Sequence, residues 1–267
     1  MSSDSEPLAL RVTPHGVVAA CPYAGSERWA RGVVSRFAAH EAAGLVALAT
    51  ARVPPHVGPS VLFWRDAAAD FLRALCHVPA TDPFTRTSLE DPSSALLAEQ
   101  TLNAPPMQGA EYITPDVLRG VWQRLRDWAV EQVGECGGLS TFLETYAPQW
   151  ARVGRVTLHL AENKGDADYP FAFMATYAAG LSRGGRVRRL PLGGALQEYA
   201  GARKKPELLK LLSPLHAAAK RSALIADLVQ TSDIFHPLVW TPDEAYEFLK
   251  EIPVYEECGL LAQLPNW

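Results

Sequence analysis

Ten basic side chains are concentrated in one stretch of the second half of the chain. Within it they are accompanied by only two carboxylates, Glu198 and Glu207, so the stretch has a net formal charge of +8. The whole chain carries −4, and the remainder therefore carries about −12. The cations of this basic band are Arg183, Arg186, Arg188, Arg189, Arg203, Lys204, Lys205, Lys210, Lys220 and Arg221.

Such a band can neutralise phosphates and release their counterions, which is the main electrostatic source of nucleic-acid affinity. Arg186, Arg188 and Arg189 lie on a glycine-bounded ribbon that is suited to follow a nucleic-acid backbone. The alternatives are a solvated face and a docking surface for an acidic protein. An overall acidic chain is also atypical of an independent DNA-binding protein. The charge pattern therefore leaves DNA and a protein partner both open.

Three other residues have side chains suited to catalysis or metal binding. His159 and Glu162 are three residues apart in an expected strand, so they should point to opposite faces, which disfavours a shared metal or an acid-base pair. His236 stands between Phe235 and Pro237, and this apolar setting predicts a hydrogen-bonded core histidine. An enzyme using these residues would need two of them in one pocket.

The common catalytic and cofactor motifs are missing from the sequence. No lysine is followed by Ser or Thr, as a complete Walker phosphate loop requires, and Gly-x-Ser-x-Gly is absent. The Gly-Gly pairs at 184–185 and 193–194 lack dinucleotide-binding spacing. Four scattered cysteines contain no Cys-x-x-Cys pair, so reduced, mostly buried thiols are expected. We expect no metal, no cofactor and no catalytic residue in this chain.

Length and composition predict a globular protein. The chain has 267 residues, 48% hydrophobic and 20% charged, which suits one large domain or two small ones. No apolar run is long enough to cross a bilayer, and the N-terminus is acidic where a secretory signal would be basic. We expect a cytoplasmic protein with no membrane partner.

The first half has mainly helical periodicity. Short apolar runs at 8–11 and 16–20 predict a small hairpin, and apolar spacing predicts helices at 26–43, 63–77, 115–136 and 139–146. Residues 79–106 are rich in turn formers, interrupted by a segment with two predicted helical turns. This stretch suggests a boundary between subdomains at 1–106 and 107–267, although one continuous domain is also compatible.

The second half mixes strands and helices. Alternating residues predict a β-hairpin from 155–163 and 170–181, followed by helices at 195–200, 206–219 and 222–230. Thr241, Pro242 and Glu244 form a capping-box signature that starts another helix, which Pro253 should end. An apolar strand at 259–264 should then need a partner. The predicted class is α+β, mainly helical, with a β-hairpin or small antiparallel sheet in the second half.

Three segments of the second half resemble a known family. They are GRVTLHLAENKGDADYPFAFMATYAAGLS (154–182), RRLPLGGALQEYAGARKKPELLKLLSPLHAAAKRS (188–222) and IFHPLVWTPDEAYEFLKEIPVYEECGLLAQLPNW (234–267). This running sequence is similar to the N-terminal accessory, or helicase-associated, region of large bacterial helicase-like ATPases of the Swi/Snf class. The similarity covers 153–267 well and 60–146 more loosely, and it includes no catalytic motif.

The resemblance implies a role beside a motor that moves on double-stranded DNA by hydrolysing ATP. It implies a non-catalytic domain that docks on or regulates this motor, in cis or in trans, and that contacts DNA; some relatives act in anti-phage defence. The ATPase motifs of the family would follow Trp267. The alternative is a stand-alone interaction module that uses the basic band to bind a protein.

Overall fold

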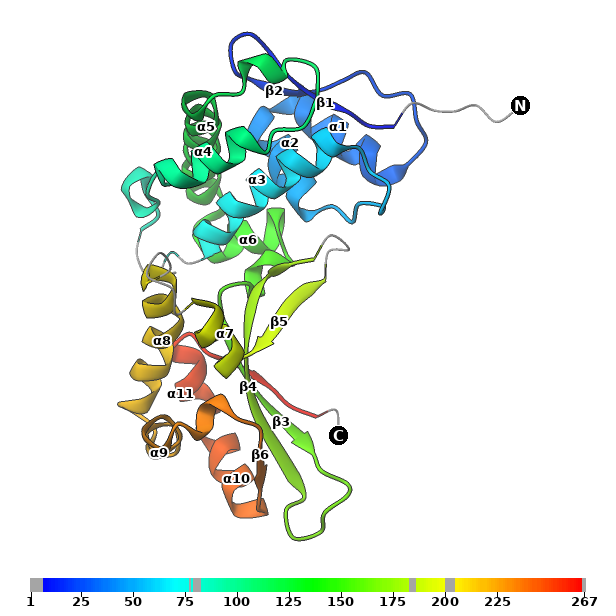
Figure 1. Ribbon diagram of the computed structural model, residues 1–267. Helices are drawn as coiled ribbons and strands as arrows, with labels where there is room; N and C mark the ends of the chain where they lie inside the picture. The colour runs from blue at the N-terminus through cyan, green and yellow to red at the C-terminus, as the bar shows by residue number, and fades with distance from the viewer. Residues whose placement is uncertain (1–6, 77, 79–82, 183–185, 200–204, 266–267) are drawn as a thin grey trace, which may run out of the picture. The chain divides into compact units, whose positions relative to one another are not determined.

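The computed structural model describes residues 7–76, 78, 83–182, 186–199 and 205–265 (Figure 1). The chain divides into two compact units. Unit 1 comprises residues 1–151 and 181–186, and unit 2 comprises residues 152–180 and 187–267. The boundary expected at residues 106 and 107 falls inside unit 1, between two helices that pack against each other. Each unit is therefore considered by itself.

Unit 1 begins with the predicted hairpin, in which β1 (Leu10–Val12) pairs antiparallel with β2 (Val18–Ala20). A later loop closes over it, because the Val12 amide donates to the Gln108 carbonyl at 3.0 Å. At Gly109, where φ is 80°, an added Cβ would lie 1.9 Å from the Val12 carbonyl oxygen. This close approach requires glycine.

The helix predicted at 26–43 is two helices. His40 has extended backbone with φ −162°, and its Nδ1 accepts a hydrogen bond from the Ala42 amide at 3.1 Å. This side-chain cap ends one helix and starts the next, a feature that apolar spacing does not reveal. The two helices are α1 (Arg28–Ala39) and α2 (Glu41–Thr50).

The remaining helices of unit 1 follow the predicted pattern. Thr114 caps the longest, with its hydroxyl accepting from the Val117 amide at 3.2 Å, and Gly137 ends it in the left-handed conformation. Trp64, Phe71, Trp122 and Phe142 are buried in the core. These helices are α3 (Pro59–Cys76), α4 (Ser94–Leu102), α5 (Pro115–Cys136) and α6 (Leu139–Tyr146). Short 3₁₀ turns lie at Arg86–Ser88, Ala110–Tyr112 and Trp150–Arg152.

Unit 2 is built on a five-stranded sheet. The predicted hairpin forms its centre, and the C-terminal strand pairs parallel with the first hairpin strand, so the sheet is mixed. The strand order is β5-β4-β3-β7, and β6 also pairs with β4. The strands are β3 (Val156–Glu162), β4 (Phe171–Leu181), β5 (Val187–Pro191), β6 (Leu238–Trp240) and β7 (Leu261–Gln263).

Helices cover one face of this sheet (Figure 1). Val156, Leu158 and Leu160 of β3, with Phe173 and Tyr177 of β4, point into the core that these helices close. The helices are α7 (Leu192–Tyr199), α8 (Lys205–Ala219), α9 (Ala223–Thr231), α10 (Pro242–Lys250) and α11 (Ile252–Glu257), with a 3₁₀ turn at Asp233–Phe235. The α+β class, mainly helical with a small sheet in the second half, is confirmed.

The start of the C-terminal helix is confirmed, and this helix ends at Lys250, before Pro253 as expected, but a second helix follows that was not predicted. The Thr241 amide donates to the Glu244 carboxylate at 2.8 Å, which completes the capping box of α10. Pro253 does not terminate the helical region. It occupies the first turn of α11, where its missing N–H costs no hydrogen bond.

Two smaller findings concern the cysteines and the membrane. None of the four cysteines forms a disulfide, as predicted, but they are half-buried rather than buried. In the part of the chain that the structure describes, no helix is both long and apolar enough to cross a bilayer.

Leu260, immediately before β7, tests whether the C-terminal segment is integral to unit 2. Its side chain is 1% exposed in the core, whereas Leu264 is 37% exposed. We expect Leu260→Ala to lower the free energy of unfolding by about 2–5 kcal/mol, because it leaves a cavity. The matched control Leu264→Ala should change it by about 0.5 kcal/mol. Urea unfolding measures both, and equal small effects would show that the C-terminal strand does not stabilise the sheet.

Candidate functional site

The sheet face opposite the helices has a polar cluster contributed by four strands. Its members are His159 of β3, Thr176 of β4, Arg189 of β5 and Gln263 of β7. Side chains alternate between faces along a strand, so His159 points away from its buried neighbours Leu158 and Leu160. We call these four residues the polar cluster.

Two hydrogen bonds connect the members of the polar cluster. The His159 Nε2 atom lies 2.7 Å from the Thr176 hydroxyl oxygen, and the Arg189 Nη1 atom donates to the Gln263 Oε1 atom at 3.5 Å. His159 and Gln263 are directly opposite in the parallel β3–β7 register. One cation and several hydrogen-bonding groups therefore share one face, an arrangement suited to binding anionic oxygens.

The pKa of His159 lies below its usual value of 6.5. Burial of the ring is the larger cause, because it disfavours the charged form, and the nearby Arg189 guanidinium adds to the effect. His159 is therefore mainly neutral at pH 7. Among the hydrogen bonds and ion pairs of the described residues, none joins His159 to a carboxylate, so a carboxylate-oriented general base is not assembled here.

Arg188 and Arg189 are consecutive on β5 and point to opposite faces of the sheet. Arg188 forms an ion pair at 3.0 Å with Glu198, which belongs to α7 on the helical face. Its neighbour Leu190, two residues along, packs against the core. Arg189 is exposed on the opposite face and has no carboxylate within ion-pair distance in the described part of the chain. The strand therefore leaves Arg189 available to bind anions.

The other members of the basic band are dispersed. Arg186 is exposed, and its amide donates to the Ser182 hydroxyl at 3.2 Å. Lys220 is exposed at the end of α8, and Arg221 forms an ion pair at 2.6 Å with Glu257. Outside the described residues lie Arg183, Arg203 and Lys204, together with the side chains of Lys205 and Lys210.

The residues considered for catalysis do not assemble. Glu162 lines an open hollow at the hairpin loop and forms an ion pair at 3.3 Å with Lys164, and neither His159 nor His236 lines that hollow. The prediction of a core position for His236 is wrong. The 3₁₀ turn before β6 buries Ile234 and leaves His236 exposed.

Sequence reasoning missed Thr176 and Gln263 as site residues. They are 17 and 104 positions from His159, and only strand pairing brings them onto one face. The available signal was the polar position in each otherwise apolar strand, namely Thr176 among alanines and aromatics and Gln263 after Leu261 and Ala262. The pairing register of β3 with β4 and β7 could not be derived from those positions alone.

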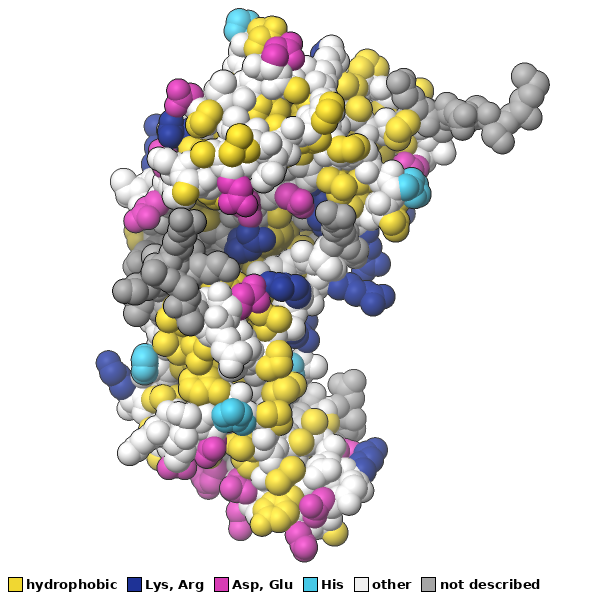
Figure 2. Space-filling model, viewed as in Figure 1, with side chains coloured by type: hydrophobic (Ala, Val, Ile, Leu, Met, Phe, Trp, Pro, Cys, Tyr) yellow, Lys and Arg dark blue, Asp and Glu magenta, His cyan; other side chains and the backbone are white. Residues whose placement is uncertain are grey.

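The charged surfaces of unit 2 are segregated. Acidic side chains gather over α9 and α10 on the face that Figure 2 shows. Asp243, Glu244 and Glu247 of α10 are all exposed. A polyanion is therefore expected to approach the β5 side of unit 2 and to avoid α10.

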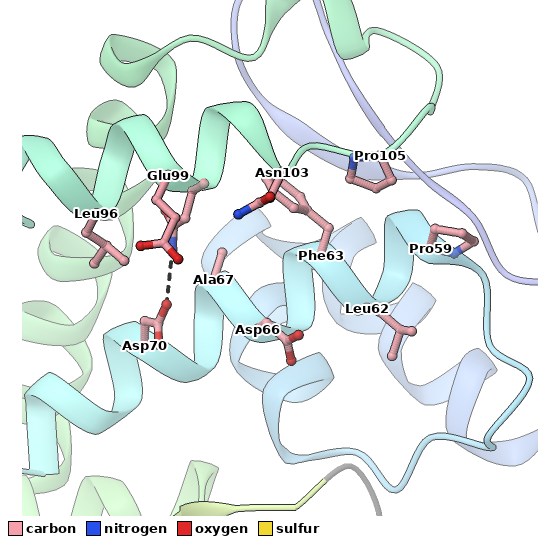
Figure 3. Close-up of a pocket in the computed structure, with 11 residues that line it drawn as sticks. Pro59, Leu62, Phe63, Asp66, Ala67, Asp70, Leu96, Glu99, Asn103 and Pro105 are labelled. Carbon is pink, nitrogen blue, oxygen red and sulfur yellow. Dashed lines mark hydrogen bonds between the residues drawn. The ribbon is translucent and has the colours of Figure 1, made fainter. Parts of the chain in front are cut away.

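A separate cleft lies between α3 and α4 in unit 1, with a volume of about 450 Å³ (Figure 3). Asp70 and Glu99 face one another across it, and Phe63 contributes to its apolar wall. Asp70 accepts hydrogen bonds from Gln100, at 3.1 Å, and from Arg73. Within the described residues, no three His, Cys, Asp or Glu side chains are grouped to hold a metal. The carboxylate Asp70 is thus already engaged in structural contacts.

Comparisons with protein-family models, with curated proteins and with solved structures found no match for this chain.

The pKa of His159 provides a test of the polar cluster. We expect Arg189→Gln to raise this pKa, because it removes the cation that disfavours protonation, whereas Arg188→Gln should leave it unchanged. NMR titration of the imidazole measures both. Since the folded protein binds this proton less readily than the unfolded chain, stability should fall as pH decreases through 6.5. Equal effects of the two variants would contradict the assignment of Arg189 to the face of His159.

Proposed function

We propose that this chain is a non-catalytic accessory module of a Swi/Snf-like DNA-translocating ATPase, and that β5 contacts the DNA backbone. The proposal rests on the resemblance of three segments, at 154–182, 188–222 and 234–267, to the helicase-associated region of that class. The partner motor would lie in cis or in trans, in the cytoplasm.

The observation that carries the DNA contact is that Arg189 of β5, and Arg186 immediately before this strand, form no ion pair with the described residues. Arg186 and Arg189 are exposed and form no ion pair with the described residues, while Arg188 is paired with Glu198. An exposed guanidinium can donate two hydrogen bonds to one phosphate. An arginine already paired with a carboxylate would first have to give up that partner.

Binding of this kind would be independent of base sequence. Phosphate contacts position a protein on the duplex but do not read bases, and their strength falls as salt rises. Such a contact suits a module that accompanies a translocating motor, because the motor must pass over every sequence. The acidic surface of α10 would disfavour a duplex on that side of unit 2.

A second function is supported by a different observation. Arg188 and Arg221 are exposed but paired with Glu198 and Glu257, at 3.0 and 2.6 Å. Exposed arginines that already pair with a carboxylate of their own chain suit a polar protein interface, because each can exchange that carboxylate for one of the partner protein. The basic band would then bind an acidic protein surface, and no DNA would be required.

Charge reversal at β5 tests the DNA contact. We expect Arg186→Glu with Arg189→Glu to weaken binding to a 20-base-pair duplex at low salt by about tenfold or more, because two attractive charges become repulsive. The matched control is Lys164→Glu, on the exposed hairpin loop, which should bind like the wild type. Fluorescence anisotropy of a labelled duplex measures the affinities.

Two outcomes would contradict the DNA contact. One is an absence of duplex binding by the wild type at low salt, and the other is an equal loss in the β5 variant and the control. Co-purification with a protein partner that resists nuclease but is lost in the β5 variant would assign the same arginines to protein docking.

A further inference from the structure

A groove between α1 and α2 in unit 1 has no part in the proposed function. It is a shallow groove open to solvent, with a volume of about 530 Å³. Five of its lining residues belong to α1, and the opposite wall is formed by Ala47 of α2 and by Ala51, which follows that helix. The α1 residues are Arg28, Trp29, Gly32, Val33 and Arg36.

The rim of this groove is basic. The helix α1 contains three arginines and no carboxylate. Arg28, Gly32 and Arg36 are spaced four residues apart, so they follow one face of the helix, and the two arginines are separated by about 12 Å along the axis. Both arginines are exposed, and the described part of the chain offers neither one an ion pair. Two cations therefore flank the groove without compensation.

The floor of the groove is apolar and includes one aromatic side chain. Val33 is buried, and Trp29 is half-buried. The Trp29 indole Nε1 atom is inaccessible to solvent, so this side chain contributes an aromatic ring to the groove and no hydrogen-bond donor.

Gly32 keeps the space between the two arginines open. A Cβ atom added there would meet no atom within 4 Å, so packing inside the protein does not require glycine. Glycine within a helix lowers the stability of that helix compared with other residues. A larger residue at this position would stabilise the helix, but its side chain would project into the groove that Gly32 lines.

We propose that the groove binds an unpaired nucleotide of a single-stranded nucleic acid. The base would lie on the apolar floor beside Trp29, and the phosphates on either side of it would contact Arg28 and Arg36. A basic groove with an aromatic side chain is the combination that binds single strands, because every base has an aromatic face and every linkage a charge. A free mononucleotide would engage only one of the two arginines.

This site shares no residue with β5, so the two proposals stand or fail separately. An acidic peptide with an apolar anchor is the competing occupant. The half-buried aromatic floor favours a base, which supplies a flat surface. The experiment below includes that peptide as a competitor.

Gly32→Gln separates binding from stability. With the full chain and a fluorescein-labelled thymidine oligonucleotide of about twelve nucleotides, we expect the affinity to fall about tenfold, because the new side chain fills the groove. The melting temperature should rise by about 2–4 °C, because glutamine favours the helix. The matched control is Gly134→Gln on α5, where an added Cβ also meets nothing within 4 Å. The control should gain stability and keep its affinity for the oligonucleotide.

A second variant removes the charges and leaves the groove open. Arg28→Glu with Arg36→Glu should weaken oligonucleotide binding about tenfold or more at low salt. The β5 variant, Arg186→Glu with Arg189→Glu, should keep the affinity of this groove for the oligonucleotide. If the Gly32→Gln variant bound the oligonucleotide as tightly as the wild type, the proposal would be overturned. A glutamate-rich, leucine-containing peptide serves as the competitor. If it displaced the labelled oligonucleotide at a lower concentration than the unlabelled oligonucleotide does, the proposal would be overturned in favour of a protein partner.

Discussion

Seven residue pairs join β3 to β4, from Val156 opposite Tyr177 to Glu162 opposite Phe171. This antiparallel register determines which side chains are buried and which are exposed in unit 2. Leu158 and Ala175 share the helical face, so His159 and Met174 share the other. A slip of one residue would exchange the two sets and place apolar side chains in solvent. Burial of the helical face therefore fixes the composition of the polar face.

The same alternation separates the two central arginines of the basic band. Arg188 is directed to α7, where Glu198 neutralises it, while Arg189 shares the face of His159 and Gln263. Consecutive cations on a strand thus have different electrostatic roles. One is paired with a carboxylate of a neighbouring helix, and the other is available to an external anion. The proposed DNA contact follows from this separation and does not need the whole basic band to form one surface.

Much of the fold is predictable from local signals. Alternation identified β3 and β4, the capping box identified α10, and Thr114 with Gly137 bounded α5, because each signal lies within a few residues of the structure it specifies. The break at His40 was missed because it depends on a side-chain cap rather than on apolar spacing, and the helix that starts at Ile252 was missed because Pro253 was interpreted only as a helix terminator. The polar cluster could not be predicted, because the parallel partner of β3 lies about a hundred residues away. Charge counting found Arg189 but could not distinguish it from the paired Arg188.

The salt dependence of duplex binding tests the central claim most directly. Each arginine that contacts a phosphate contributes about 0.9 to the slope of log affinity against log salt concentration. The account predicts that Arg189→Gln reduces the slope by about 1 and that Arg188→Gln leaves it unchanged. Equal reductions in the two variants, or a slope that neither variant alters, would contradict the claim that the sheet exposes one arginine to DNA and pairs the other internally.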